Sequence, residues 1–403
     1  MVSAPSRWRW VIGAAAVCAV YLVIRSIADL HTAFGGGSAV DYLAIASAGR
    51  VVHGGSSCVY CAGPLGAAQA QLLGYTPAAS ATFPVPFVNP ALMAWLIQPL
   101  ALLPLQTGTD VFAAINVVAM ALSAAILTRR AAPSLGGPLA ACLVVTAVFS
   151  LEAGTGILLG QSDGLMLLAA TLAIEALHRG RPVIAGLLLV PLLLKPQLVW
   201  LVPPVLIVAR QWRMLCPLAA GAVVVLLGSI AVAGPGHLLD AIGLVTAPAY
   251  AHLDLQSNSI PALIARPLAS NPAAWVAALS LAVLAVVTMV VLRDVFRRNV
   301  VPALAIGLGL SVVLSPHLGD YSLMLLAIPV ATLAPRAPAL ALVLAAAYTA
   351  ASLFNPLNPL NESTVALVLL VGLAAVVWRA THAGSGGVAM QLPRRSPAGV
   401  GNA

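Results

Sequence analysis

The chain has 403 residues, of which 61% are hydrophobic and only 7% are charged. Soluble domains have roughly 45–50% apolar and about 25% charged residues, so this composition excludes a soluble domain and predicts an all-α, polytopic membrane protein. The net charge of +8 does not indicate nucleic-acid binding, because the arginines occur in short clusters between apolar runs. Such clusters are typical of the cytoplasmic ends of membrane spans.

The first apolar run covers residues 10–30. It follows Arg7 and Arg9 and lacks a small-residue cleavage site, so it is predicted to be retained as the first membrane span. Because positive residues stay on the cytoplasmic side, the N-terminus is expected inside. Residues 31–87 are then the first extracytoplasmic loop.

Two features stand out in that first loop. The stretch "DYLAIASAGRVVHGG" predicts an amphipathic helix on the membrane surface, with Asp41 at its start. Cys58 and Cys61 form a CxxC motif, which permits a local disulfide if the loop faces an oxidising compartment. The motif alone is too short to indicate a redox function.

Twelve further apolar runs follow, and not all of them can cross the membrane. The arginine clusters place both termini inside, which requires an even number of spans, so roughly twelve transmembrane helices are expected. Either 88–104 or 109–128 does not span, or Arg129 and Arg130 lie outside. The runs lie at 88–104, 109–128, 138–152, 160–177, 182–194, 198–210, 214–234, 273–293, 301–314, 320–334, 337–352 and 363–380.

The domain organisation expected from these runs is simple. Residues 1–380 form a single transmembrane domain, and residues 381–403, rich in Gly, Pro, Ser and Arg, form a disordered cytoplasmic tail. Several runs are only about 13–15 residues long, too short to cross a bilayer untilted. Irregular turns between such short helices are tolerated where they line a cavity inside the protein.

Polar residues collect on the predicted outer side. Ionisable groups at membrane depth are costly, usually face the bundle interior or a wet cavity, and mark function. The outer set comprises Asp41, Gln161, Asp163, Lys195, Gln197, His237, His252, Asp254, Gln256, Asn258, Arg266, His317, Asp320 and Tyr321. Other interpretations remain open: Asp41 as a helix cap, Gln161 as a packing residue, and His317 with Asp320 as a structural pair.

Lys195 is the only lysine of the chain and lies between aliphatic runs in "LLLKPQLVW". Pro196 ends a helix here and favours an extended backbone for the residue before it. A charge beside a helix break favours a functional role, with snorkelling to the membrane interface as the alternative.

Seven short motifs follow one another along most of the chain. They are "VDYLAIASAG", "FPVPFVNPALMAWLIQPLALLP", "LGQSDGLMLL", "LLLKPQL", "ARQWR", "LQSNSIPALIAR" and "LSPHLGDYSLMLL". In this order the chain resembles the GT-C glycosyltransferases of family 87, the polyprenol-phosphate-mannose-dependent α-mannosyltransferases of mycobacterial cell-envelope assembly. The chain has Gly160-Gln161-Ser162-Asp163 where the family commonly has Gly-Gln-x-Asn, so sugar and acceptor do not follow from the likeness.

The resemblance implies a GT-C fold with a long first outer loop, and an inverting transfer that needs no cofactor. Asp41 is then the catalytic base, Lys195 and Arg266 bind the donor phosphate, and His317 donates to that phosphate or shuttles a proton. Gln161 is a candidate for binding sugar or acceptor hydroxyls. Asn258 and Asp320 are added to that group from their position in the chain rather than from the family motifs.

The substrates implied are a polyprenyl-phosphate sugar, mannose first and arabinofuranose second, and a glycolipid or glycan acceptor. Transfer is expected at the outer face of an actinobacterial plasma membrane. The protein is expected to contact the lipid bilayer and to bind no nucleic acid. Two other classes are weighed. A transporter or flippase also has broken helices with buried charges, and a non-catalytic scaffold leaves the outer polar set unexplained.

Overall fold

The computed structural model describes residues 39–74, 85–149, 151–246, 293–315 and 320–333, with scattered residues in 13–32 and 283–290. Within these ranges every regular element is helical, as the composition predicted. The α-helices are α2 (Val40–His53), α3 (Ala62–Leu73), α4 (Ala91–Leu96), α5 (Gln98–Ala101), α6 (Leu105–Leu135), α7 (Gly137–Val148), α8 (Leu151–Leu159), α9 (Asp163–His178), α10 (Pro182–Leu188), α11 (Val202–Val208), α12 (Trp212–Thr246), α16 (Arg293–Arg298), α17 (Val300–Val313) and α18 (Ala327–Leu333). The 3₁₀ helices are η2 (Val190–Leu194), η3 (Pro196–Leu198) and η5 (Asp320–Leu326).

Two helices in the described ranges are long and apolar enough to cross a membrane. They are Leu105–Pro133 in α6 and Trp212–His237 in α12, with mean hydropathies of 2.2 and 2.4. At 1.5 Å per residue, each is longer than a hydrocarbon core of about 30 Å. The expected total of roughly twelve spans remains a prediction, since the runs 10–30 and 273–293 are described only at scattered residues. The last two runs and the tail 381–403 lie outside the described residues.

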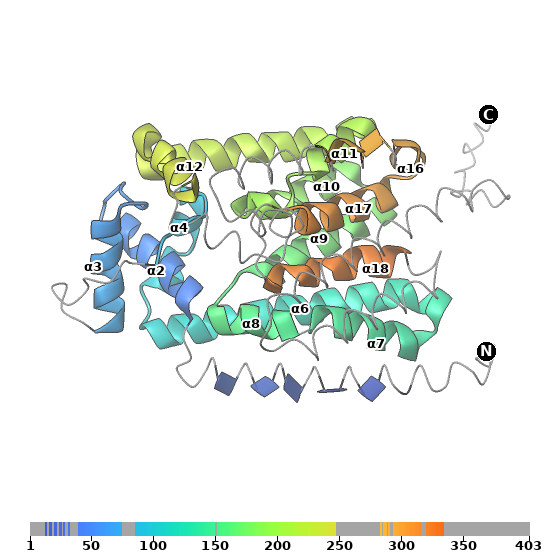
Figure 1. The fold of residues 1–403 in the computed structure, drawn as a ribbon, viewed down its shortest axis with the longest axis horizontal. Helices are drawn as coiled ribbons and strands as arrows, with labels where there is room; N and C mark the ends of the chain where they lie inside the picture. The colour runs from blue at the N-terminus through green and yellow to red at the C-terminus, as the bar shows by residue number, and fades with distance from the viewer. Residues whose placement is uncertain are drawn as a thin grey trace, which may run out of the picture.

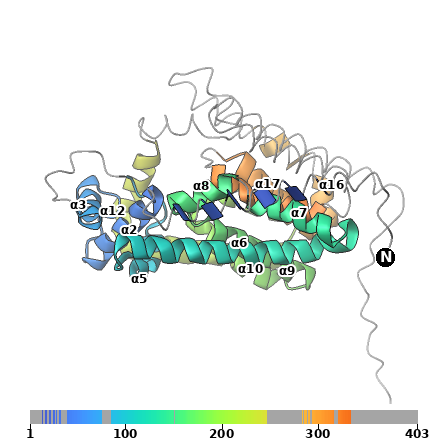
Figure 2. The ribbon, with the colours of Figure 1, turned by 90° about the horizontal axis from the view of Figure 1, so that it is seen from below.

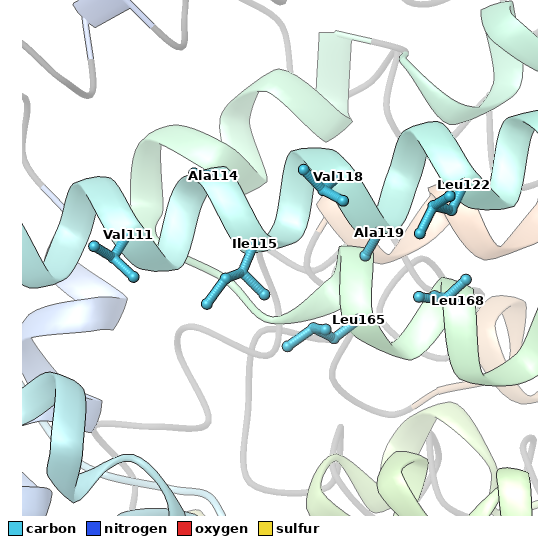
Figure 3. Close-up of a pocket in the computed structure, with 8 residues that line it drawn as sticks. All are labelled: Val111, Ala114, Ile115, Val118, Ala119, Leu122, Leu165 and Leu168. Atoms are coloured by element: carbon cyan, nitrogen blue, oxygen red, sulfur yellow. The ribbon is translucent and has the colours of Figure 1, made fainter.

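The exposed face of α6 is aliphatic. Val111, Ile115, Val118 and Leu122 recur at helical spacing and are between 37% and 58% exposed. With Leu165 and Leu168 of α9 they line an open groove of about 440 Å³, whose lining is aliphatic throughout (Figure 3). A continuous exposed apolar surface of this kind suits lipid rather than water.

The run 88–104 folds as two short helices, α4 and α5, of six and four residues. Pro99 interrupts the helical hydrogen-bonding pattern between them. At 1.5 Å per residue neither helix reaches across a bilayer of about 30 Å. Of the alternatives left open by the charge pattern, the structure therefore favours a non-spanning 88–104 and a spanning 109–128.

The core of the bundle is built from broken helices packed between α6 and α12. Helix α6 contacts α9, α9 contacts α10, and α10 contacts α12 (Figure 1). The segment 182–208 is divided into α10, η2, η3 and α11, which confirms the short helices and irregular turns expected there. One element was not expected: α8 fills residues 151–159, where the apolar pattern is interrupted by Gly154 and Gly156.

The described helices of the first loop, α2 and α3, lie at one end of the bundle, beside the end of α12 (Figures 1 and 2). The helix predicted at Asp41 is confirmed as α2, but the predicted surface face is wrong: every residue from Tyr42 to Gly49 is buried. Small side chains explain this, because a Cβ on Gly49 would lie 2.8 Å from the Cβ of Ala101 on α5. Helix α2 is a packed element of the fold.

Candidate functional site

Lys195 lies at the break between η2 and η3, with a non-helical backbone (φ −132°, ψ 74°). This confirms the helix break that Pro196 predicted, although ψ falls short of the extended range. The residue is only 4% exposed. Its ammonium forms an ion pair with Asp163, at 2.5 Å from Nζ to Oδ2, and donates a short hydrogen bond to Oε1 of Gln161. Burial at this level contradicts the snorkelling interpretation, in which the charge reaches water.

The hydrogen bonds continue from both partners of Lys195. The amide nitrogen of Gln161 donates to Oδ2 of Asp41 on α2, at 2.5 Å. On the other side, Oδ1 of Asp163 accepts from the hydroxyl of Ser322 in η5, at 2.8 Å. Five side chains separated by up to 281 positions in the chain thus form one network, Asp41–Gln161–Lys195–Asp163–Ser322, hereafter the polar network.

The turn that carries Gln161 is formed by a Schellman motif at the end of α8. The amide of Gln161 donates to the carbonyl of Gly156 and that of Gly160 donates to Ile157. Gly160 has the left-handed φ of +74° that the motif requires, and a Cβ there would collide with the Cβ of Tyr42. The turn therefore approaches α2 directly beside Asp41.

Helix α9 is fixed by a second close approach. A Cβ on Gly164 would lie 2.6 Å from the backbone oxygen of Asn116 on α6. The side chain of Asn116 also accepts a hydrogen bond from the amide of Leu165, at 3.2 Å. The first turn of α9, and with it Asp163, is thereby held against α6.

The polar network differs in exposure from one end to the other. Asp163 and Lys195 are almost fully buried, whereas Asp41 is only half-buried. Taking an ion pair out of water costs several kcal/mol per ion unless partners compensate. Here Lys195 donates a hydrogen bond to Gln161, and Asp163 accepts one from Ser322. Asp41 is the more exposed of the two carboxylates in the network.

Two hydroxyl groups, those of Ser162 and Tyr42, belong to residues adjacent in the chain to members of the polar network. The hydroxyl of Ser162, between Gln161 and Asp163, is buried and has no hydrogen-bond partner within the described part of the chain. Buried polar groups are normally paired, so this hydroxyl is an available donor beside the ion pair. The phenol of Tyr42 donates to the carbonyl of Leu100, and burial raises the pKa of this tyrosine to about 12, so it stays a donor at neutral pH.

The sequence model of glycosyltransferase family 87 matches residues 87–316, more than half of the chain. The chain belongs to glycosyltransferase family 87. This membership implies a glycosyltransferase with a sugar donor and an acceptor, in agreement with the resemblance seen in the motifs. No curated protein and no solved structure matches the chain significantly.

The family 87 match covers the middle of the polar network but not its ends. Gln161, Asp163 and Lys195 lie within residues 87–316, while Asp41 and Ser322 lie outside that range. Asp41, Gln161 and Lys195 are site residues predicted from the sequence, and the structure brings them together. No role was predicted for Asp163 or Ser322.

For the remaining predicted site residues, Asp320, His317, Arg266 and Asn258, the structure describes no side-chain position. Asp320 begins η5, two residues before Ser322 in the chain. His317, Arg266 and Asn258 lie outside the described residues. Their assigned functions therefore stay predictions.

Two other groupings lie apart from the polar network. The aliphatic groove is lined by Leu165 of α9 (Figure 3). Residues two apart on a helix point about 200° from each other, so the groove opens on the opposite face of α9 from Asp163. Among the described residues, metal-ligating side chains gather at Cys58, Cys61 and His237, away from the network. Cys58 and Cys61 are joined by a disulfide, as the CxxC motif permitted.

Proposed function

We propose that this family 87 protein is an inverting transferase that moves a sugar, mannose in the first instance, from a polyprenyl-phosphate donor to a hydroxyl of a cell-envelope glycolipid or glycan. The reaction is assigned to the outer face of the plasma membrane. The observation that carries the proposal is the polar network, which joins a half-buried carboxylate to a buried ion pair through one amide.

Asp41 is the proposed base. Its carboxylate takes the proton of the acceptor hydroxyl, and the oxygen then attacks C1 of the sugar from the face opposite the phosphate. The bond between C1 and the phosphate oxygen breaks, and the lipid phosphate leaves with the electron pair. The hydrogen bond from Gln161 fixes the orientation of the Asp41 carboxylate, which general-base catalysis requires.

Lys195 and Arg266 are proposed to stabilise the departing phosphate. Positive charge in a water-poor site stabilises developing negative charge far more than it does in water. The pairing with Asp163 holds the Lys195 ammonium in one place before the donor arrives, so no reorganisation is needed during the reaction. Arg266 adds the second positive charge and a bidentate geometry.

The other predicted residues complete the proposal. His317, which titrates near neutral pH when unperturbed, donates to the phosphate or shuttles the proton. Gln161, Asn258 and Asp320 bind hydroxyls of the sugar or the acceptor. The unpartnered hydroxyl of Ser162 is an additional donor for these groups.

A lipid-linked donor is consistent with the surroundings of the site. The aliphatic face of α6 is exposed on the far side of α9 from the polar network. If this face contacts the bilayer, a polyprenyl chain can remain in the membrane while its phosphate reaches the polar network. A water-soluble nucleotide sugar has no such need for an apolar neighbourhood.

The test is transfer by membranes that contain the full chain, supplied with polyprenyl-phosphate mannose, arabinofuranose or glucose and a glycolipid acceptor. Wild-type membranes should transfer one of these sugars with inversion at C1, and Asp41→Asn should reduce the rate by about 100-fold or more. Asp110→Asn is the matched control, since Asp110 is also half-buried and accepts from a glutamine, Gln106, at 2.7 Å.

The proposal would be wrong if Asp41→Asn, present at the wild-type level in the membrane, transferred sugar at the wild-type rate. A product with retained configuration at C1 would contradict the single-displacement step. Movement of the lipid-linked sugar across proteoliposomes without any transfer would favour the transporter or flippase alternative.

A further inference from the structure

Cys58, Cys61 and His237 meet where the first loop touches the end of α12. The two cysteines lie between α2 and α3, and His237 lies 176 positions after the second of them. The ligand atoms of the three side chains all lie within 4.8 Å of one another, and Nδ1 of His237 is 4.0 Å from Sγ of Cys58. All three residues are half-buried.

Apolar packing brings these residues together independently of the sulfur chemistry. Val59 and Tyr60, between the cysteines, are buried in a cluster that includes Ala233 of α12. Immediately after Ala233, Gly234 has a left-handed φ of 78° and bends the helix, so that His237 turns toward the loop. The hydroxyl of Tyr60 is anchored on the carbonyl of Asn89, at 3.0 Å.

A carboxylate supports the histidine. Oδ2 of Asp240 lies 2.6 Å from Nδ1 of His237, one turn further along α12. Two sulfurs and one imidazole nitrogen supply three of the four ligands of a tetrahedral Zn²⁺ site, and a carboxylate oxygen is a suitable fourth. The CxxC spacing is common in zinc sites because it directs both sulfurs toward one point.

We propose that Cys58, Cys61 and His237, in the dithiol form of the protein, bind one Zn²⁺ ion, with Asp240 as the fourth ligand or the partner that orients His237. Reduction of the disulfide by a dithiol or phosphine takes two electrons and two protons and gives two thiols. Zn²⁺ then displaces both thiol protons and accepts a lone pair from the imidazole. The disulfide and the zinc site are alternative states of the same sulfurs.

The disulfide state and the zinc-bound state link different parts of the chain. The disulfide closes a ring within residues 58–61, entirely inside the first loop. A zinc ion instead ties that loop to α12. The apolar cluster at this junction also contains Ile45 of α2 and contacts Leu194, the neighbour of Lys195, so it connects the junction to the elements that carry Asp41 and Lys195.

The test uses the full-length protein in detergent, reduced with a phosphine under anaerobic conditions, freed of reductant and titrated with Zn²⁺. We expect the reduced wild type to retain one zinc per chain by elemental mass spectrometry and the oxidised protein to retain none. Titration with Co²⁺ should give a thiolate-to-metal charge-transfer band. Cys58→Ser, Cys61→Ser and His237→Ala should each weaken binding by at least about tenfold.

Two controls are available within the chain. His53→Ala removes an exposed histidine of the same loop, and Cys216→Ser removes an exposed free cysteine on α12. Both should bind zinc as the wild type does. Equal zinc binding by oxidised and reduced wild type, or by His237→Ala and wild type, would overturn the proposal.

A second measurement needs no variant. In the reduced wild type, Zn²⁺ should slow alkylation of Cys58 and Cys61, followed by peptide mass spectrometry, by about tenfold or more, while Cys216 keeps its rate. Unchanged alkylation of Cys58 and Cys61 at saturating Zn²⁺ would contradict the site even if the cysteine variants failed to fold.

Discussion

Helix α9 carries a carboxylate ion pair at each end, and the two pairs differ in burial. At its first residue, Asp163 pairs with Lys195, and the two side chains are 1% and 5% exposed. In its last turn, Glu175 pairs with Arg130 on α6 at 2.5 Å and with Arg179 at 2.9 Å, where the arginines are 39% and 64% exposed. One helix therefore carries a buried and an exposed carboxylate ion pair, about 18 Å apart along its axis.

The difference indicates which pair serves the fold and which serves a site. The exposed arginines belong to the clusters that mark the predicted cytoplasmic side, and exposed ion pairs contribute about 0–1 kcal/mol. The buried pair is costly to form, and an apolar pair of similar volume is often as stable or more so. We therefore expect the buried charge pair, which is linked to the half-buried carboxylate of Asp41, to serve function, and the following substitutions test that contrast.

The largest effect is expected at the buried pair. Lys195→Met should destabilise the protein by about 3–5 kcal/mol, because it leaves Asp163 charged and buried without its cation. Sugar transfer should fall by about 100-fold or more, since a positive group near the leaving phosphate is lost. Unfolding by denaturant in detergent and the transfer assay measure the two effects separately.

The double variant Lys195→Met with Asp163→Leu separates stability from function. Removing both charges should restore most of the free energy of unfolding, since no unpaired ion remains. Transfer should stay as low as in Lys195→Met. A double variant that transfers sugar at the wild-type rate would show that the buried pair is structural after all.

The next largest effect is expected at the side-chain amide of Gln161, which lies between Asp41 and Lys195 in the network. Gln161→Leu should cost about 1–3 kcal/mol, because Asp41 and Lys195 each lose a hydrogen-bond partner. Gln69→Leu is the matched control: Gln69 is also buried and bonds both backbone groups of Val85. We expect similar unfolding free energies for the two variants and a loss of transfer of about tenfold with Gln161→Leu alone. Equal transfer by both variants would remove Gln161 from the site.

A smaller effect is expected at the far end of the network. Ser322→Ala removes one hydrogen bond to Asp163 and should cost about 1 kcal/mol. Ser123→Ala, which removes a buried hydroxyl bonded within its own helix, provides the comparison. Transfer should decrease by less than about tenfold in Ser322→Ala and remain unchanged in Ser123→Ala. A loss as large as that in Lys195→Met would mean that Ser322 contacts the substrate itself.

The smallest effect is expected at the exposed pair. Glu175→Gln should change the free energy of unfolding by less than about 1 kcal/mol and leave transfer unchanged, and this small difference should shrink further at high salt. Loss of transfer in Glu175→Gln would break the contrast between the two ends of α9.

Local features of the site followed from the sequence, and long-range ones did not. Pro196 predicts the break at Lys195, and Asp41 opens a predicted helix, because both depend on near neighbours. The partner of Lys195 lies 32 positions away and Ser322 lies 159 positions from Asp163, distances over which no periodic pattern operates. One signal was present: an isolated aspartate at the start of an apolar helix needs a cation, and the chain has a single lysine.

The incorrect predictions about the fold also have causes that can be traced to particular residues. Helix α8 was not expected, because Gly154 and Gly156 weaken the apolar pattern, yet glycines are tolerated where neighbouring helices pack closely. The two faces predicted for α2 were wrong, because its small side chains let other helices cover the side that composition assigned to water. The charge clusters alone did not decide whether the run 88–104 spans the membrane. Pro99 favours a non-spanning segment only together with the short helices α4 and α5 seen in the structure.

Residue 160 shows that the geometry of this site depends on volume as much as on charge. It has no functional group, yet any side chain there would have to adopt a left-handed backbone and displace Tyr42. Asp41 precedes Tyr42 directly, so that displacement would carry the proposed base away from Gln161 and the ion pair behind it. A search for essential residues limited to polar side chains would pass over the position that sets the spacing between them.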